Sequence, residues 1–205
     1  MDFLLGRLLY LPGILLGISV HECSHGYAAV RMGDDTPLMQ GRITLNPLRH
    51  LDPIGFLCLL VFGFGWANPV QINPRNFRNP RRDDALVSLA GPVSNFLVAF
   101  LFMGLMKLAD MYLPYTLPNQ IVFEVLRSTV YINLVLMAFN LIPIPPLDGH
   151  HILGSIGGAK VWNFYYKYRE QLRFALLLLI VFRGIGRIIG PVINAIYRFL
   201  FSIFF

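Results

Sequence analysis

The chain has 205 residues, of which 56% are hydrophobic and 14% are charged, and it carries a formal net charge of +6. Soluble domains have about 25% charged residues, so this composition excludes an ordinary soluble protein and indicates an integral membrane protein with several spans. The length leaves no room for a second sizeable soluble domain. Basic residues collect in the cytoplasmic loops of membrane proteins, which explains the positive charge better than nucleic-acid binding does. We therefore expect a lipid bilayer and no nucleic acid among the partners.

Residues 4–30 are predicted to form the first membrane helix, because a helix of that length can cross about 30 Å of hydrocarbon. Residues 8–20 contain no charged side chain, and the sequence HECSH follows directly at residues 21–25. The amino terminus lacks a basic region followed by a small-residue cleavage site, and its apolar run continues into the HECSH motif. We therefore expect a helix that is retained and not a signal peptide.

The HECSH motif has the residue types and the spacing of a metal site. Side chains four residues apart lie on one face of a helix, so His21 and His25 can share a metal ion. Glu22 then lies close enough to act as a general base on a metal-bound water. Three ionisable side chains within a membrane helix are costly and usually mark a functional site. For that reason a pair of structural histidines facing a polar cavity is the less favoured interpretation.

Residues 42–46 and 69–73 are predicted to be β-strands. Each segment alternates polar and apolar side chains, ends in asparagine and is followed by proline, a pattern typical of a half-buried strand. Residues 54–66 between them are apolar but too few for a helix that spans the membrane. We therefore expect a small β-sheet at the cytoplasmic face and a re-entrant segment that enters the membrane and returns on the same side.

Two more membrane helices are predicted at residues 85–106 and 121–142. The first of them carries the sequence GPVSN at residues 91–95. The second ends in a proline-rich stretch, because proline cannot continue helical hydrogen bonding, and Asp148 follows that stretch directly. Together with the helix at residues 4–30, these two helices are expected to form a three-helix catalytic core in a polytopic α-helical membrane protein.

The remainder of the chain is predicted to be helical too. Residues 150–171 are mixed and rich in aromatic side chains, which is typical of a helix at the membrane interface. Residues 172–205 are apolar but interrupted by arginine, glycine and proline, and they fit either one further span or a broken pair of helices. We expect a single membrane-embedded domain over residues 1–205, with its core at about residues 4–155 and C-terminal interfacial and membrane helices at residues 156–205.

The expected topology follows from the distribution of charge. If residues 54–66 do not cross the membrane, the first and third spans end on the same side, and Asp148 can meet the HECSH motif. The basic residues on that side are Arg31, Arg42, Arg49, Arg75, Arg78, Arg81, Arg82, Lys160, Lys167, Arg169 and Arg173. The charged residues of the opposite loop are Lys107 and Asp110. Because basic residues favour the cytoplasmic side, the site is predicted to open toward the cytoplasm.

Zinc in a hydrolase takes three protein ligands and keeps one position open for water. His21 and His25 supply two ligands, and Asp148 is predicted to supply the third. The extended, proline-rich backbone before Asp148 is tolerated at membrane depth only where it lines a cavity or is buried in protein. Taken alone, Asp148 would be a helix cap, but the metal motif favours a ligand. Other histidines could replace it, although loop or interfacial roles explain them better: His50, His150 and His151.

Two asparagines in the predicted spans, Asn95 and Asn140, have two possible roles. Asparagine commonly forms hydrogen bonds between membrane helices. It can also donate to a substrate carbonyl or to an oxyanion. The residues alone favour neither role.

Taken together, the motifs resemble the site-2 protease family of intramembrane zinc metalloproteases. The resemblance is carried by HECSH at residues 21–25, GPVSN at residues 91–95 and NLIPIPPLDG at residues 140–149, in that order within about residues 10–155. It implies that zinc is held by His21, His25 and Asp148, that Glu22 is the base, and that Asn140 and Asn95 contact the substrate. The pair His150-His151 departs from the small or basic residues expected after the last motif.

The predicted function is that of an intramembrane zinc metalloprotease in the cell membrane, which cuts peptide bonds in or near the transmembrane segments of other proteins, often in regulated proteolysis. The alternative from another class is a metal-binding membrane transporter. A transporter would need polar residues along a complete path across the bilayer, and the outer halves of the predicted spans are almost wholly apolar.

Overall fold

The computed structural model describes residues 2–62, 65–114, 116–182 and 184–205. These residues form α-helices, two short 3-10 turns and connecting segments. The elements in chain order are α1 (Asp2–Met32), α2 (Thr36–Met39), η1 (Pro47–Arg49), α3 (Pro53–Phe62), η2 (Pro74–Asn76), α4 (Pro80–Tyr112), α5 (Leu117–Asn140), α6 (Asp148–Lys167), α7 (Arg169–Val181) and α8 (Gly184–Phe204).

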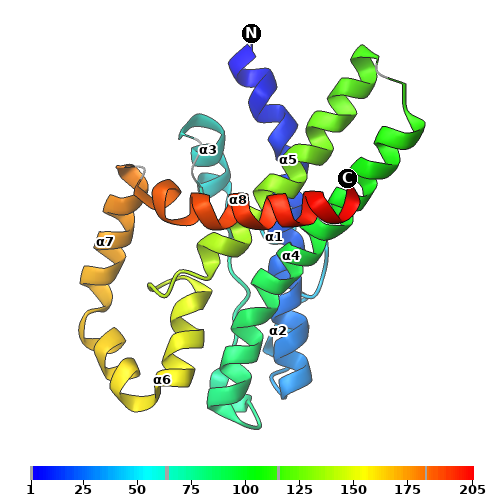
Figure 1. Cartoon of the computed structure of the whole chain (residues 1–205). Helices are drawn as coiled ribbons and strands as arrows, with labels where there is room; N and C mark the ends of the chain where they lie inside the picture. The colour runs from blue at the N-terminus through cyan, green and yellow to red at the C-terminus, as the bar shows by residue number, and fades with distance from the viewer. Residues whose placement is uncertain (1, 63–64, 115, 183) are drawn as a thin grey trace.

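The helices α1, α4 and α5 pack against one another and form the predicted three-helix core. Figure 1 shows that α1 and α5 run in one direction and α4 in the other, so that α1 and α5 end toward the same side of the molecule. Within the described residues, three helices are long and apolar enough to cross a membrane, namely α4, α5 and α8. The chain is therefore a multi-pass helical membrane protein.

The predicted membrane helices at residues 85–106 and 121–142 correspond to α4 and α5. Met103 on α4 and Val130 and Leu134 on α5 are fully buried in their contact. The helix α1 is 31 residues long, but its carboxyl-terminal half carries the polar HECSH motif and it is not one of the three apolar helices. That α1 spans the bilayer stays a prediction.

The predicted β-sheet is wrong. No strand forms in residues 42–46 or 69–73, and the described part of the chain has only one isolated antiparallel bridge, between Leu51 and Ala67. The asparagine that ends each segment explains the difference, because its side chain begins a 3-10 turn. Asn46 accepts from the backbone N–H of Leu48 and Asn73 from that of Arg75, at 3.0 and 3.2 Å. The following proline, which has no N–H, suits the first position of such a turn.

The segment predicted to be re-entrant contains the ten-residue helix α3; residues 63 and 64 lie outside the described residues. The two ends of this segment lie side by side. Leu51 is bridged to Ala67, and the backbone N–H of Asn68 donates to the carbonyl of His50 at 2.7 Å. The segment that contains α3 therefore starts and ends at the same place in the fold. Whether it enters a membrane in between stays a prediction.

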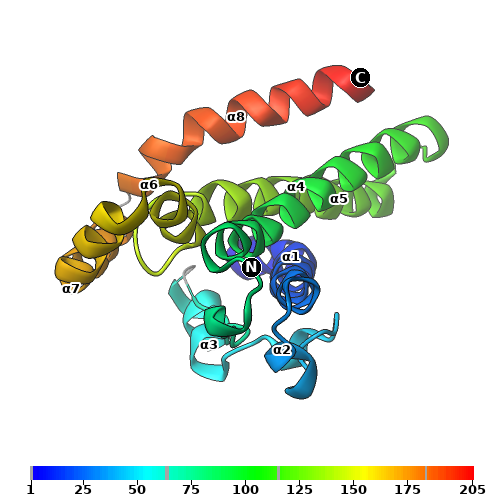
Figure 2. The ribbon, with the colours of Figure 1, turned by 90° about the horizontal axis from the view of Figure 1, so that it is seen from below.

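The C-terminal region forms the broken pair of helices, α7 and α8, and not one continuous helix; residue 183 between them lies outside the described residues. Figure 1 shows α8 lying across α4 and α5, and Figure 2 places it on the opposite side of them from α2 and α3. The buried side chains Ile185, Ile189 and Ile193 recur every four residues and face the core. This spacing puts them on one face of the helix.

Candidate metal centre

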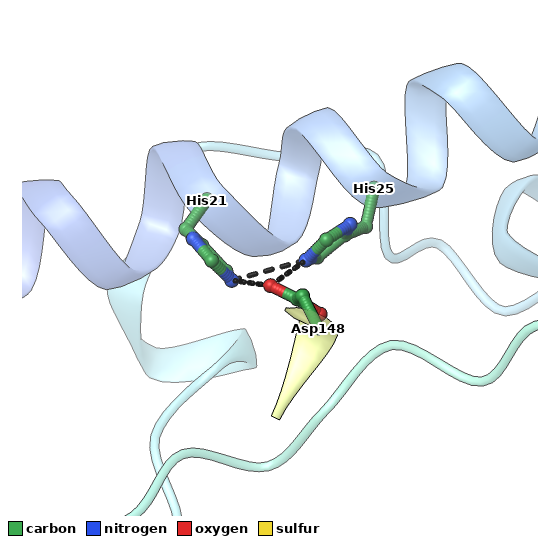
Figure 3. Close-up of side chains that lie close together, drawn as sticks. All are labelled: His21, His25 and Asp148. Carbon is green, nitrogen blue, oxygen red and sulfur yellow. Dashed lines mark hydrogen bonds and ion pairs between the residues drawn. The ribbon is translucent and has the colours of Figure 1, made fainter. Parts of the chain in front are cut away.

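Three side chains from two distant segments converge on one point (Figure 3). His21 and His25 lie one turn apart on α1, and Asp148 is the first residue of α6. The two Nε2 atoms are 3.0 Å apart, and the Oδ2 atom of Asp148 lies 3.2 Å from that of His21 and 3.3 Å from that of His25. Within the described residues, no other group of three histidine, cysteine or acidic side chains comes together in this way.

The tautomers of both histidines follow from their other contacts. The Nδ1 atom of His21 lies 2.7 Å from Oδ1 of Asn95, and that of His25 lies 2.7 Å from the carbonyl oxygen of Val87. Oδ1 of Asn95 is identified as the acceptor because its Nδ2 donates to the Gly17 carbonyl. Since these oxygens can only accept, each Nδ1 carries a proton and donates it, and in the neutral ring Nε2 then presents a lone pair.

The convergent atoms are therefore suited to a cation between them. With both rings neutral, two lone pairs and a carboxylate oxygen face one another, and Oδ2 of Asp148 is buried without a hydrogen-bond partner. Ligands at about 2.0–2.2 Å from a tetrahedral zinc ion lie about 3.3 Å apart, which matches the separations of 3.0–3.3 Å found here. The arrangement of two histidines and one carboxylate fits zinc and leaves a fourth position open.

The helix α4 approaches this centre with bare backbone at Gly91. A Cβ atom at this position would lie 2.4 Å from Nε2 of His25 and 2.7 Å from Nε2 of His21. Any side chain there would clash with the imidazole rings of both histidines. The glycine of the GPVSN motif is thus required by the close approach of α4 to His21 and His25.

The three alternative histidines have other partners. His50 lies 2.8 Å from the carbonyl of Thr44 through Nε2, and His150 lies 2.5 Å from the carbonyl of Leu147 through Nδ1. The Nδ1 atom of His151 lies 3.0 Å from the Asp84 carboxylate of α4. The contact of His151 holds α6 against α4, which fixes the position of the helix that begins with Asp148.

Glu22 is held by a backbone group that the sequence did not reveal. Its Oε2 atom accepts a hydrogen bond of 2.8 Å from the N–H of Val70. The extended segment that carries Val70 runs beside α1 and is fixed again at Asn73, whose N–H donates to Asp34 at 2.7 Å. The alternation that suggested a strand therefore marks a segment whose N–H groups bind two carboxylates.

A cavity of about 540 Å³ opens beside the metal centre. His21, Glu22 and Asn140 line it, together with apolar side chains of α1, α5 and α7. It adjoins a second, apolar cavity of about 500 Å³ between α1, α3, α5 and α8. The two cavities share the lining residues Ile18, Gly65, Trp66, Leu136, Phe139 and Ile180. Apolar side chains thus line a route to the metal centre from the space between α1, α3, α5 and α8.

The two asparagines occupy different places. Asn140 lines the cavity, and its amide donates one hydrogen bond to the carbonyl of Leu136 at 3.0 Å. Asn95 is fully buried and supports His21. Its Nδ2 donates to the carbonyl of Gly17 at 3.0 Å and to Asn133 at 2.9 Å, which leaves no N–H for a substrate. Asn133, a helix-to-helix link in this network, was not identified from the sequence.

Comparison with known proteins agrees with this site. The pattern of Peptidase family M50 matches residues 102–181, which include Asn140 and Asp148. A protein of Bacillus subtilis (strain 168), named "Putative zinc metalloprotease YwhC", is 38% identical over 185 residues, which cover 89% of this chain and 84% of the relative. The relative named Rip2 in Mycolicibacterium smegmatis is 29% identical over 77% of this chain and 64% of its own length.

A third relative, MJ0611 of Methanocaldococcus jannaschii, is 32% identical over 49% of each chain. No solved structure matches the sequence. The similarity to the Bacillus protein extends over most of both chains. The chain therefore belongs to peptidase family M50, the site-2 protease family of zinc metalloproteases.

Proposed function

We propose that this intramembrane zinc metalloprotease binds zinc through His21, His25 and Asp148 and uses Glu22 as its general base. The observation that carries the ligand assignment is the meeting of two imidazole lone pairs and a buried, unpartnered carboxylate oxygen at ligand-to-ligand distances. The cavity beside them is mostly apolar, as expected of a site for the transmembrane segments of other proteins. The family assignment gives no support to the alternative of a transporter.

The chemistry divides between the metal and the side chains of this chain. Zinc, when bound, acts as a Lewis acid and lowers the pKa of a bound water. Glu22 accepts the proton of the attacking water and passes it to the leaving amine. The N–H of Val70 holds the Glu22 carboxylate in place. Asn140 has one amide hydrogen beyond its bond to Leu136, and this hydrogen is directed to the substrate carbonyl.

The role assigned to Asn95 is to orient His21, not to contact the substrate. A ligand histidine whose other ring nitrogen donates to a fixed acceptor keeps its tautomer and its direction toward the metal. The amide of Asn95 is itself fixed by Gly17 and Asn133 on the neighbouring helices α1 and α5. The metal site is thereby tied to the packing of the three-helix core.

The proposed topology has residues 54–66 entering the membrane and returning on the cytoplasmic side, where the active site opens. Two observations support it. The ends of the segment lie together at Leu51 and Ala67, and the basic residues gather on the side where α1 and α5 end.

The substitution Glu22→Gln tests the proposed function. Gln keeps an oxygen that can accept from Val70 and is not a zinc ligand, so zinc content and melting temperature should stay unchanged. Loss of a positioned base costs about 10²–10⁴-fold in rate, measured as cleavage of a transmembrane model substrate in liposomes. Glu124→Gln, at an exposed pair with Arg127 on α5, is the matched control. Full cleavage by a folded, zinc-loaded Glu22→Gln variant would remove Glu22 from the mechanism.

A further inference from the structure

Among the described residues that line the active-site cavity, one cationic side chain is not used by the mechanism. Glycine, proline and apolar residues make up most of its lining, and the side chains with ionisable or amide groups are His21, Glu22, Asn140 and Arg173. The first two belong to the metal centre and the general base, and Asn140 is assigned to the substrate carbonyl. Arg173, on α7, has no role in this chemistry.

The helix α7 presents one continuous face to the cavity. Arg173, Leu177 and Ile180 recur at intervals of four and three residues and all line it, as side chains on one helix face do. Leu176 and Ile180 pack into the core, whereas Arg173 is only partly buried. Figure 1 shows α7 standing beside the three-helix core, not within it. Arg173 is thus the charged residue at one end of the face of α7 that lines the cavity, and the rest of this face is apolar.

The guanidinium of Arg173 has capacity for a ligand. It has five N–H donors, and within the described residues it makes one hydrogen bond, of 3.2 Å, to Oε1 of Glu170. The side chain of Glu170 is 77% exposed, and an ion pair of this kind contributes little to stability. The planar donors of arginine match the two oxygens of a carboxylate. The unused donors therefore suit an anionic group that enters the cavity.

The two joined cavities differ in polarity from end to end. The cavity between α1, α3, α5 and α8 is lined almost wholly by apolar side chains, and Arg173 is not among them. Of these two cavities, Arg173 lines the one that contains His21 and Glu22, and it also borders a smaller cavity beside His151 and Trp162. A transmembrane segment changes from apolar to polar along its length in the same way, because its apolar stretch ends in polar or charged residues at the membrane surface.

We propose that Arg173 determines the specificity of the protease by binding a carboxylate of the substrate next to the end of its transmembrane segment. This inference rests on the proposed function and names the feature of the substrate that the site selects. With the carboxylate at Arg173, the apolar part of the segment extends into the apolar cavity, and the peptide bond between them lies at Glu22. The carboxylate belongs either to an aspartate or glutamate side chain or to the carboxyl terminus of the substrate.

The test uses the full-length, zinc-loaded enzyme in liposomes with a set of synthetic transmembrane substrates. One substrate has aspartate beside the apolar stretch and an amidated terminus, and a second has asparagine there and the same amide. A third has asparagine and a free terminal carboxylate at that point. We expect the wild type to favour one or both carboxylate substrates by about tenfold in kcat/KM, which identifies the source of the carboxylate. Arg173→Gln should abolish this preference, so that the three substrates are cleaved with similar kcat/KM.

Two further variants separate binding of the substrate from a structural role. Arg169→Gln removes a basic residue one turn earlier, which borders the smaller cavity beside Trp162 but does not line the active-site cavity, and should keep the preference. Arg173→Glu should prefer a substrate with lysine in place of the aspartate. If Arg173→Glu does not fold, the glutamine variant and the substrate series decide. Zinc content and melting temperature are measured for each variant.

The outcomes distinguish this inference from the proposed function. An unchanged preference in a folded Arg173→Gln variant, or equal cleavage of all substrates by the wild type, would overturn the role of Arg173 while leaving the protease assignment intact. If the wild type cleaves no substrate, or if cleavage persists in Glu22→Gln, the proposed function itself fails.

Discussion

At the scale of single residues, the metal centre depends on the missing side chain of Gly91 as well as on its three ligands. The ligand atoms of His21 and His25 face Gly91 of α4, where a Cβ atom would come within 2.4 Å of a ligand nitrogen. Contacts of that length do not occur, so a side chain would force the histidines or the helix to move. The smallest possible substitution therefore becomes a sensitive probe of the centre.

Gly91→Ala should weaken zinc binding by at least tenfold, because support around a metal ligand is typically worth about 10–100-fold in affinity. Zinc content is measured by atomic emission after competition with a chelator. Gly104→Ala is the matched control in the same helix, since its Cβ would meet only the ring edge of Phe204, at 3.2 Å. Asp148→Ala provides the reference for a lost ligand. Normal zinc affinity in Gly91→Ala would contradict the proposed metal position.

The sequence was most informative where residue type and spacing alone define the chemistry. The histidines of the HECSH motif share a helix face by periodicity, so their meeting was predictable. Asp148 was predictable as the third ligand because the extended, proline-rich backbone before it is tolerated at membrane depth only beside a cavity or within protein. The N–H of Val70 and the packing of Asn133 were not, because a backbone donor has no signature in the sequence and an asparagine between helices resembles any other.

At the scale of elements, residues 69–76 are fastened to the end of α1 by one carboxylate. Asp34 is fully buried and accepts hydrogen bonds from the hydroxyl and N–H of Thr36, the N–H of Asn73 and the amide of Asn76, at 2.5–3.2 Å. Burial raises the pKa of Asp34, but these hydrogen bonds lower it further, so that its pKa lies below the ordinary value. The ionised carboxylate thus stabilises the folded state.

The sign of the pH effect follows from the lowered pKa of Asp34. The contribution is complete above the pKa that Asp34 has in the unfolded chain, about 3.9, and is lost as the pH falls through its lower folded value. Asp34→Asn should lower the free energy of unfolding at neutral pH by about 1–3 kcal/mol. The difference in melting temperature from the wild type should shrink as the pH falls below about 4. Asp35→Asn, at an exposed neighbour, should show neither effect.

The error in the predicted sheet has its origin at this scale. Residues 42–46 and 69–73 have the alternation of strands, but a strand needs a neighbour to receive its N–H groups. The side chains of Asn46 and Asn73 turn the chain instead, and two N–H groups of the second segment bind Glu22 and Asp34. Local alternation indicates an extended backbone and does not reveal its hydrogen-bond partners.

At the scale of the whole molecule, the site exists only if segments far apart in the sequence meet on one side. The helix α1 brings the histidines and α5 ends just before Asp148, and Figure 1 shows both helices ending toward the same side. Between α1 and α5 the chain contains α3 and α4. For α1 and α5 to end on the same side, the chain must cross the membrane an odd number of times between them. In the proposed topology α4 makes this single crossing. A crossing at α3 would place the two ends on opposite sides.

Single cysteines at positions 49, 75 and 110, in a background without Cys23 and Cys58, test this topology with a membrane-impermeant thiol reagent. Positions 49 and 75 flank α3 and should react from the same side, which the basic residues identify as cytoplasmic. Position 110 lies near the end of α4, a helix of 33 residues that extends about 50 Å, and should react from the other side. Reaction of positions 49 and 75 from opposite sides would mean that α3 crosses the bilayer. The contact of Asp148 with His21 and His25 would then be impossible, and the proposed active site with it.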